Sequence, residues 1–93
     1  MFKIVFKPVA IEQLKKMKRY YGAIVVDAIE SHLSEEPEKS QGSIKRLRAR
    51  QDATFRLRVR DYRVFYDVVE DRVEILQILH KSETPSFYRE EGK

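Results

Sequence analysis

The feature that most constrains this chain is the alternating run TFRLRVRDYRVFYD at residues 54–67. Strand side chains point to opposite faces in turn, so the run predicts a β-hairpin with one apolar and one basic face. With its turn at Arg60 and Asp61, Arg58 lies opposite Arg63. The apolar face comprises Phe55, Leu57, Val59, Tyr62, Val64 and Tyr66. The opposite face, called the arginine face below, carries Arg56, Arg58 and Arg63. Like charges directly opposite destabilise a sheet, so we expect this face to meet a polyanion or an acidic partner.

The positive charge of the chain is concentrated in one region. Residues 45–63 hold eight basic and two acidic side chains, whereas the other residues hold 11 basic and 13 acidic ones. A local basic patch on a near-neutral body favours a phosphate-bearing partner, and arginine suits bidentate contact with phosphate. Residues 45–50 could instead form only a charged strand edge that discourages aggregation. Further contacts to a phosphate backbone are expected from Lys45, Arg46, Arg48, Arg50 and Arg60.

Length and composition exclude several classes of protein. The 93 residues fit a single domain, residues 1–93, with a small core. The sequence has no cysteine and therefore no disulfide or thiolate site. It contains neither an apolar run of membrane-spanning length nor an N-terminal signal peptide, so we expect a cytoplasmic protein with no membrane partner. No Asp, Glu or His cluster has metal-ligand spacing, so we expect no metal and no cofactor.

The order of predicted elements gives the fold class. Residues 2–7 alternate as a strand, and Pro8 can begin a helix, which Gly22 should break. A second helix is expected over about residues 23–34, followed by a polar loop. Further strands are expected at residues 44–49, 54–60, 62–69 and 72–80. The prediction is an α+β fold with two N-terminal helices packed on a small, mainly antiparallel sheet, and with a short C-terminal helical tail. The first strand should join the sheet at an edge.

The last predicted strand also alternates. If Val73, Ile75 and Leu79 face the helices, Leu76 and Ile78 fall on the arginine face. That apolar strip could seat a segment of a partner protein or be covered by the C-terminal tail.

The string LRVRDYRVFY, the strand after it, the pair His80 and Lys81, and a C-terminal Tyr88 together resemble the RelE/ParE superfamily of bacterial toxins. These are the toxic halves of type II toxin–antitoxin systems. The resemblance implies a RelE-like fold and a small antitoxin with an acidic toxin-binding segment. RelE-like members are endoribonucleases that cut messenger RNA in the ribosomal A site, which would make mRNA and the ribosome partners. ParE-like members act on DNA gyrase and cleave no RNA. The family's ribonuclease site corresponds here to Arg56, Arg58, Arg63, His80, Lys81 and Tyr88.

The chemistry of RNA cleavage suggests roles for these residues. Attack by the 2′-OH on the scissile phosphate needs a base, positive charge on the transition state and an acid for the departing 5′-oxygen. Arginines supply the fixed charge. Histidine is the residue type whose unperturbed pKa suits acid or base work near neutrality, which makes His80 a candidate. Tyr88 or Lys81 could transfer a proton if neighbouring arginines lower its pKa. We expect Tyr88 to be essential and His80 to contribute, although His80 could equally be structural and the arginines could be only a solvated face.

The sequence therefore predicts a RelE-like, metal-independent endoribonuclease toxin. The alternatives are a gyrase-directed ParE-like toxin and, third, an RNA-binding module without catalytic activity.

Overall fold

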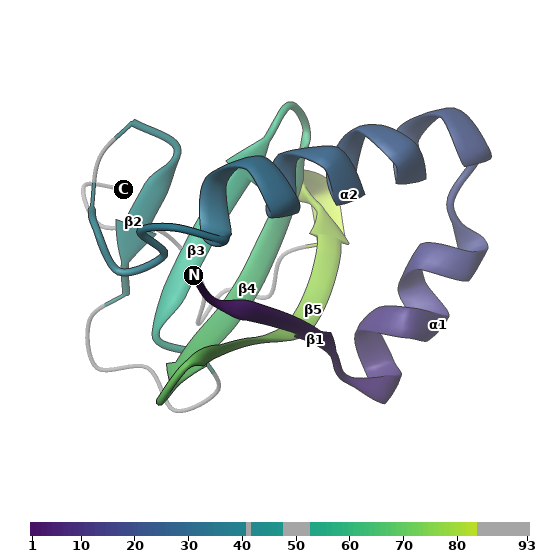
Figure 1. Ribbon diagram of the computed structural model, residues 1–93. Helices are drawn as coiled ribbons and strands as arrows, with labels where there is room; N and C mark the ends of the chain where they lie inside the picture. Colours follow the sequence, from purple (N-terminus) through teal and green to yellow (C-terminus); the bar gives the residue numbers. More distant parts are fainter. Residues whose placement is uncertain (41, 48–52, 84–93) are drawn as a thin grey trace.

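The computed structural model of the protein describes residues 1–40, 42–47 and 53–83. Of the residues singled out in the sequence, Arg48, Arg50 and Tyr88 lie outside the described residues. Figure 1 shows the elements, which in chain order are β1 (Lys3–Phe6), α1 (Pro8–Lys16), α2 (Arg19–Leu33), β2 (Ile44–Arg46), β3 (Phe55–Val59), β4 (Tyr62–Val69), β5 (Arg72–His80) and the 3-10 turn η1 (Lys81–Glu83).

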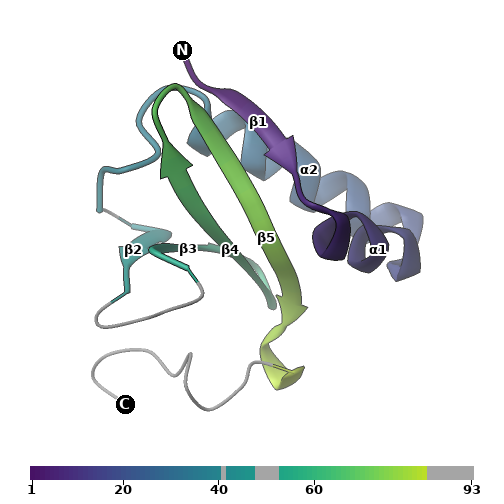
Figure 2. The same ribbon diagram turned by 90° about the horizontal axis from the view of Figure 1, so that it is seen from below.

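The five strands form one sheet in the order β1-β5-β4-β3-β2. β1 pairs with β5 in parallel, and the other neighbours are antiparallel. Both helices lie on one side of this sheet, as Figures 1 and 2 show. The predicted α+β fold, the mainly antiparallel sheet and the edge position of the first strand are confirmed. No helix in the described part of the chain is long and apolar enough to cross a membrane.

The break between the two helices is not where the sequence predicted it. α1 begins at Pro8, as expected, but the chain turns at Met17 and Lys18, whose ψ angles of 152° and 142° are extended. α2 then continues through Gly22, so the prediction that this glycine breaks the helix is wrong. Glycine costs a helix interior only about 1 kcal/mol, and the buried apolar face of α2 outweighs that cost.

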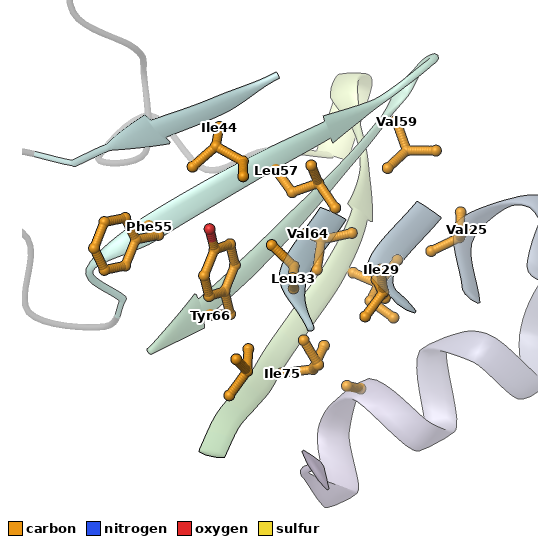
Figure 3. Packing of buried hydrophobic residues seen from close by; sticks show 13 residues of the cluster. Val25, Ile29, Leu33, Ile44, Phe55, Leu57, Val59, Val64, Tyr66 and Ile75 are labelled. Atoms are coloured by element: carbon orange, nitrogen blue, oxygen red, sulfur yellow. The ribbon is translucent and has the colours of Figure 1, made fainter. Parts of the chain in front are cut away.

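The main core lies between the helices and the sheet, where the apolar face of the hairpin meets α2 (Figure 3). Phe55 and Tyr66 stack there with ring centroids 5.4 Å apart. The Tyr66 hydroxyl donates a hydrogen bond to the carbonyl oxygen of Pro37 at 2.6 Å. Burial raises the pKa of the Tyr66 hydroxyl well above its usual range. The nearby positive charge of Arg56 acts in the opposite direction but is the smaller effect. This tyrosine therefore ties the loop after α2 to the centre of the sheet.

A β-bulge changes the alternation of β5. Tyr66 pairs with Ile75, but Phe65 pairs with Gln77, so Leu76 is an extra residue in the ladder. Beyond the bulge the faces of β5 are reversed relative to simple alternation. Ile78 joins the helix-side core and Leu79 lies on the other face, the opposite of the prediction for both residues.

The face of the sheet away from the helices carries a second, smaller apolar cluster. Its centre is Phe65, which is 1% exposed although it belongs to the arginine face of the hairpin. The other members are Leu47, Ala53, Leu76 and Leu79. The predicted apolar strip therefore exists, but Leu79 takes the place expected for Ile78.

Candidate functional site

The β3–β4 hairpin has the predicted register. Val59 pairs with Tyr62 and Arg58 pairs with Arg63. The two-residue turn places Arg60 at a φ of 55°, in the left-handed region that favours glycine. The missing glycine is therefore accommodated by backbone strain at the turn. The bulge in this sheet lies between β4 and β5 instead.

Arg58 and Arg63 form the exposed part of the arginine face. Arg58 is exposed and Arg63 is half-buried, and register places the two residues directly opposite each other. Arg63 Nη1 donates to the carbonyl oxygens of Arg60 at 3.2 Å and Tyr62 at 3.1 Å. These two bonds hold the Arg63 guanidinium at the turn end of the hairpin. Two neighbouring arginines, one of them anchored, concentrate positive charge at this place.

Arg56 lies on the same face but differs in its surroundings. Only 4% of its surface is exposed. Its neighbours across the sheet are Lys45 on β2 and Phe65 on β4. Arg56 Nη1 donates to the carbonyl oxygen of Ser43 at 3.2 Å. Arg56 therefore links β3 to the segment before β2, and in this conformation it offers little surface to a ligand.

The other predicted RNA contacts are divided between faces. Lys45 pairs with Arg56 and joins the arginine face. Arg46 pairs with Phe55, and its guanidinium carbon lies 5.3 Å from the centre of the Phe55 ring, on the helix side at the sheet edge. Arg60 is exposed at the hairpin turn. A ligand on the arginine face would thus meet Lys45 at one end and Arg60 at the other.

The structure does not bring His80 to the arginine face. His80 pairs with Tyr62, which faces the helices, and the two rings are 5.4 Å apart in an edge-to-face arrangement. The bulge at Leu76 separates this position from the arginine face. Ser82 N donates to His80 Nδ1 at 3.1 Å, so the neutral imidazole carries its proton on Nε2. The expectation that His80 lies beside Arg58 and Arg63 is therefore corrected.

Lys81 closes the end of β5 against the hairpin turn. Its backbone N donates to the carbonyl oxygen of Asp61 at 2.7 Å, and its ammonium lies 3.5 Å from the Asp61 carboxylate. Both side chains are largely exposed, so this ion pair contributes little to stability. Lys81 thus lies near the turn end of the hairpin.

The arrangement can bind a phosphate backbone and stabilise negative charge on a phosphate. Arg58 and Arg63 supply fixed charge, and Lys45, Arg60 and Lys81 extend the basic surface. Among the described residues no group of His, Cys, Asp and Glu could hold a metal ion. The arginines can stabilise negative charge on a phosphate, but arginine does not give up its proton. A separate group would have to transfer protons at this face.

Sequence reasoning missed a hollow on the helix side of the sheet. The hollow has a volume of about 600 Å³ and lies between the α1–α2 junction and the end of β5. Tyr21, Tyr62 and His80 line it together with Lys16 and Lys18. The signal was present in the sequence as KKMKRYY at residues 15–21, a basic run that ends in two tyrosines.

Comparison with known proteins identifies the family. The sequence profile described as "ParE toxin of type II toxin-antitoxin system, parDE" matches residues 4–85. The chain belongs to this toxin family. No curated protein matches the sequence at a significant level.

Solved structures place the toxin in the wider RelE/ParE superfamily. The RelBE2 toxin–antitoxin complex from Mycobacterium tuberculosis contains a chain with 30% identity and a TM-score of 0.74; the match covers 85% of this toxin and 96% of that chain. The isolated Escherichia coli RelE toxin has 15% identity and a TM-score of 0.72, over 94% and 92% of the two chains. A chain of the RelE–RelB complex from the archaeon Pyrococcus horikoshii has 16% identity and a TM-score of 0.69, and the match covers 89% of this toxin and 98% of that chain. The last two matches show a shared fold. The resemblance seen in the sequence, and the RelE-like fold that it implied, are confirmed.

Proposed function

We propose that this toxin is a metal-independent endoribonuclease that cleaves messenger RNA in the ribosomal A site. The observation that carries the proposal is the pairing of Arg58 with Arg63 on the exposed part of the arginine face. Like charges directly opposite each other destabilise a sheet, and a phosphate bound between the two arginines would remove the repulsion. In the proposed reaction the substrate's 2′-OH attacks the scissile phosphate, and the two arginines stabilise the charge that develops on its oxygens.

Proton transfer is proposed for Tyr88 or Lys81. His80 is on the helix side of the sheet, so its proposed contribution is indirect at most. Tyr88 remains the principal candidate and belongs to the part of the chain outside the described residues. Lys81, at the end of β5, is the second candidate, because its backbone N bonds the Asp61 carbonyl oxygen in the β3–β4 turn and so places the residue at the turn end of the hairpin.

The cellular partner is proposed to be a cognate antitoxin. The 30%-identical chain from M. tuberculosis was solved as a toxin–antitoxin complex. A net charge of +6 over residues 45–63 suits an acidic segment that folds onto the arginine face. An antitoxin bound there would also exclude messenger RNA.

A ParE-like toxin directed at DNA gyrase is the second candidate. The specific observation in its favour is the family match itself, because the matching profile is that of the ParE toxins. Such a toxin would need no phosphate chemistry at the arginine face. The two candidates therefore differ in whether the toxin cleaves RNA at all, and only the ribonuclease candidate predicts cleavage that depends on Arg63.

Brief induction of the toxin, followed by primer extension on messenger RNA, tests the proposal. We expect new 5′ ends within coding regions for the wild type and none for Arg63→Ala, because loss of one transition-state contact of this kind costs about 3–4 kcal/mol. Arg72→Ala is the matched control: it removes one arginine at the far end of β5 and should leave cleavage intact. Binding of the antitoxin to each variant would show that it is folded. Intact messenger RNA with broken DNA after wild-type induction would favour the gyrase candidate.

A further inference from the structure

The α1–α2 junction is a second basic surface, separate from the arginine face. Residues 15–21 contribute four exposed cationic side chains, Lys15, Lys16, Lys18 and Arg19. They are followed by Tyr20 and Tyr21, which are 63% and 40% exposed. We call residues 15–21 the basic–aromatic corner.

The tyrosines of this corner belong to a series of aromatic rings. The Tyr20 and Tyr21 ring centroids are 5.1 Å apart, those of Tyr21 and Tyr62 are 6.2 Å apart, and those of Tyr62 and His80 are 5.4 Å apart. The series runs from the start of α2 to the end of β5. Its last three members, Tyr21, Tyr62 and His80, line the hollow of about 600 Å³, whose other walls include Lys16 and Lys18. An extended ligand would therefore meet aromatic surfaces and positive charge side by side.

The corner is only weakly neutralised by acidic groups. Glu12 lies 3.8 Å from the Lys15 ammonium, and both side chains are exposed. Glu83 lines the hollow, and its carboxylate accepts a hydrogen bond from the backbone N of His80. Within the described residues Lys16, Lys18 and Arg19 form no ion pair with an acidic side chain. Three positive charges thus remain available to an anionic ligand.

We propose that the basic–aromatic corner binds single-stranded RNA. Phosphates would lie against Lys16, Lys18 and Arg19, and a base would stack on Tyr20, the most exposed ring. Proteins bind single strands by this combination of a basic track and aromatic platforms. An acidic protein segment would satisfy the lysines but would leave the exposed rings without a function. The choice of RNA over DNA rests on the proposed ribonuclease function.

The position of the corner suggests how it would serve cleavage. Tyr62, on the helix side, is followed on β4 by Arg63, on the arginine face. The bonds from Arg63 Nη1 to the carbonyl oxygens of Tyr62 and Arg60 hold its guanidinium at the same end of the sheet. One RNA strand passing around this end could touch both surfaces. The corner would then hold the RNA that flanks the scissile phosphate.

The test is direct binding to an RNA that cannot be cleaved. We would measure the affinity of the full-length toxin for a fluorescein-labelled 2′-O-methyl oligouridine of about 20 nucleotides by anisotropy at several salt concentrations. A Lys16→Ala/Lys18→Ala variant should bind about tenfold more weakly near physiological salt. Its plot of log affinity against log salt should be shallower by about 1.4, since each phosphate contact on a single strand contributes about 0.7. Tyr20→Ala should lose roughly fivefold or more, as expected for one stacked base, and Tyr20→Phe should retain wild-type affinity.

A Lys3→Ala/Lys39→Ala variant is the matched control. It removes two positive charges from exposed positions outside the corner and should change the affinity little. An equal loss of affinity in this control would show that only the net charge matters and would overturn the proposal. Wild-type affinity in the corner variants would also overturn it. Unchanged RNA affinity with weakened binding of poly-L-glutamate would assign the corner to an acidic protein instead. Primer extension in cells reports cleavage independently of this binding measurement. Loss of the binding proposal would therefore leave the proposed ribonuclease function intact, and absence of cleavage in cells would not by itself remove RNA binding at the corner.

Discussion

Arg56 and Arg58 lie two residues apart on the same face of β3, but they differ in exposure and therefore in what they can do. Arg56 is buried and donates to the carbonyl oxygen of Ser43. Arg58 is exposed opposite Arg63. The aliphatic part of a buried arginine also packs against its neighbours. Alternation alone cannot separate these two residues, because the Ser43 carbonyl oxygen that Arg56 bonds belongs to another segment of the chain.

This difference predicts opposite phenotypes for two alanine variants. Arg56→Ala should lower the free energy of unfolding by about 2 kcal/mol, because it removes a buried charged hydrogen bond and its packing. Arg58→Ala should change the free energy of unfolding by less than about 0.5 kcal/mol but should greatly reduce messenger RNA cleavage. Urea denaturation and primer extension measure the two effects. Equal stability of the two variants would contradict the structural role assigned to Arg56.

The Tyr66 hydroxyl gives a prediction that depends on pH. Tyr66→Phe keeps the stacking on Phe55 but loses the hydrogen bond to Pro37, so it should cost about 1–2 kcal/mol at pH 7. Because burial raises the pKa of Tyr66, the folded state holds the neutral hydroxyl. This contribution is complete below the ordinary tyrosine pKa of about 10 and is lost as the pH rises above it.

Urea denaturation at pH 7, 9 and 10.5 checks this prediction. The stability difference between wild type and Tyr66→Phe should be constant from pH 7 to 9 and smaller at pH 10.5. The exposed Tyr20→Phe variant serves as the control and should match the wild type throughout. A difference that does not change above pH 10 would show that the Tyr66 hydroxyl ionises normally in the fold.

At the scale of elements, α2 contains a glycine that does not end the helix. Gly22 lies inside α2, and a Cβ added there meets nothing within 4 Å. Gly22→Ala should therefore raise the free energy of unfolding by about 0.5–1 kcal/mol, through a lower entropy of the unfolded chain and a better helix propensity. Thermal or urea unfolding measures this change. Ala23→Gly, one residue further along α2, should lower stability by a similar amount, and a Gly22→Ala variant no more stable than wild type would contradict the assignment.

The sheet shows which elements a sequence can predict and which it cannot. The β3–β4 hairpin was predicted in register, because alternating arginines and apolar residues distinguish its two faces. The bulge in β5 was not predicted, because Leu76, Ile78 and Leu79 are all apolar and suit either face of the sheet. The helix break at Met17 and Lys18 was also missed, since neither residue is a helix breaker.

The candidate site was predicted to a similar degree. Arg58 and Arg63 are paired as expected, because their placement follows from the hairpin alone. His80 was misplaced, because its face depends on a bulge four residues earlier in the chain. The basic–aromatic corner was overlooked, although its residues are contiguous, because the hollow beside it forms only when the α1–α2 junction packs beside the ends of β4 and β5.

At the scale of the whole molecule, the toxin presents two basic surfaces, one on each side of the sheet. Both helices lie on one of these sides, as Figure 2 shows. The arginine face carries the charges proposed for chemistry, and the basic–aromatic corner lies on the helix side. Both reach the end of the sheet where the β3–β4 turn meets Lys81. We therefore expect the orientation of RNA on the toxin to be set by two contacts rather than one.

The chemistry of the RNA ends tests the central claim most directly. Purified toxin would be mixed with ribosomes stalled on a defined messenger RNA, and the ends of the fragments would be identified. Attack by the 2′-OH predicts a 2′,3′-cyclic phosphate on the upstream fragment and a 5′-hydroxyl on the downstream fragment, formed by the wild type and by Arg72→Ala but not by Arg63→Ala. Intact messenger RNA under these conditions, or fragments with 5′-phosphate ends, would contradict the account.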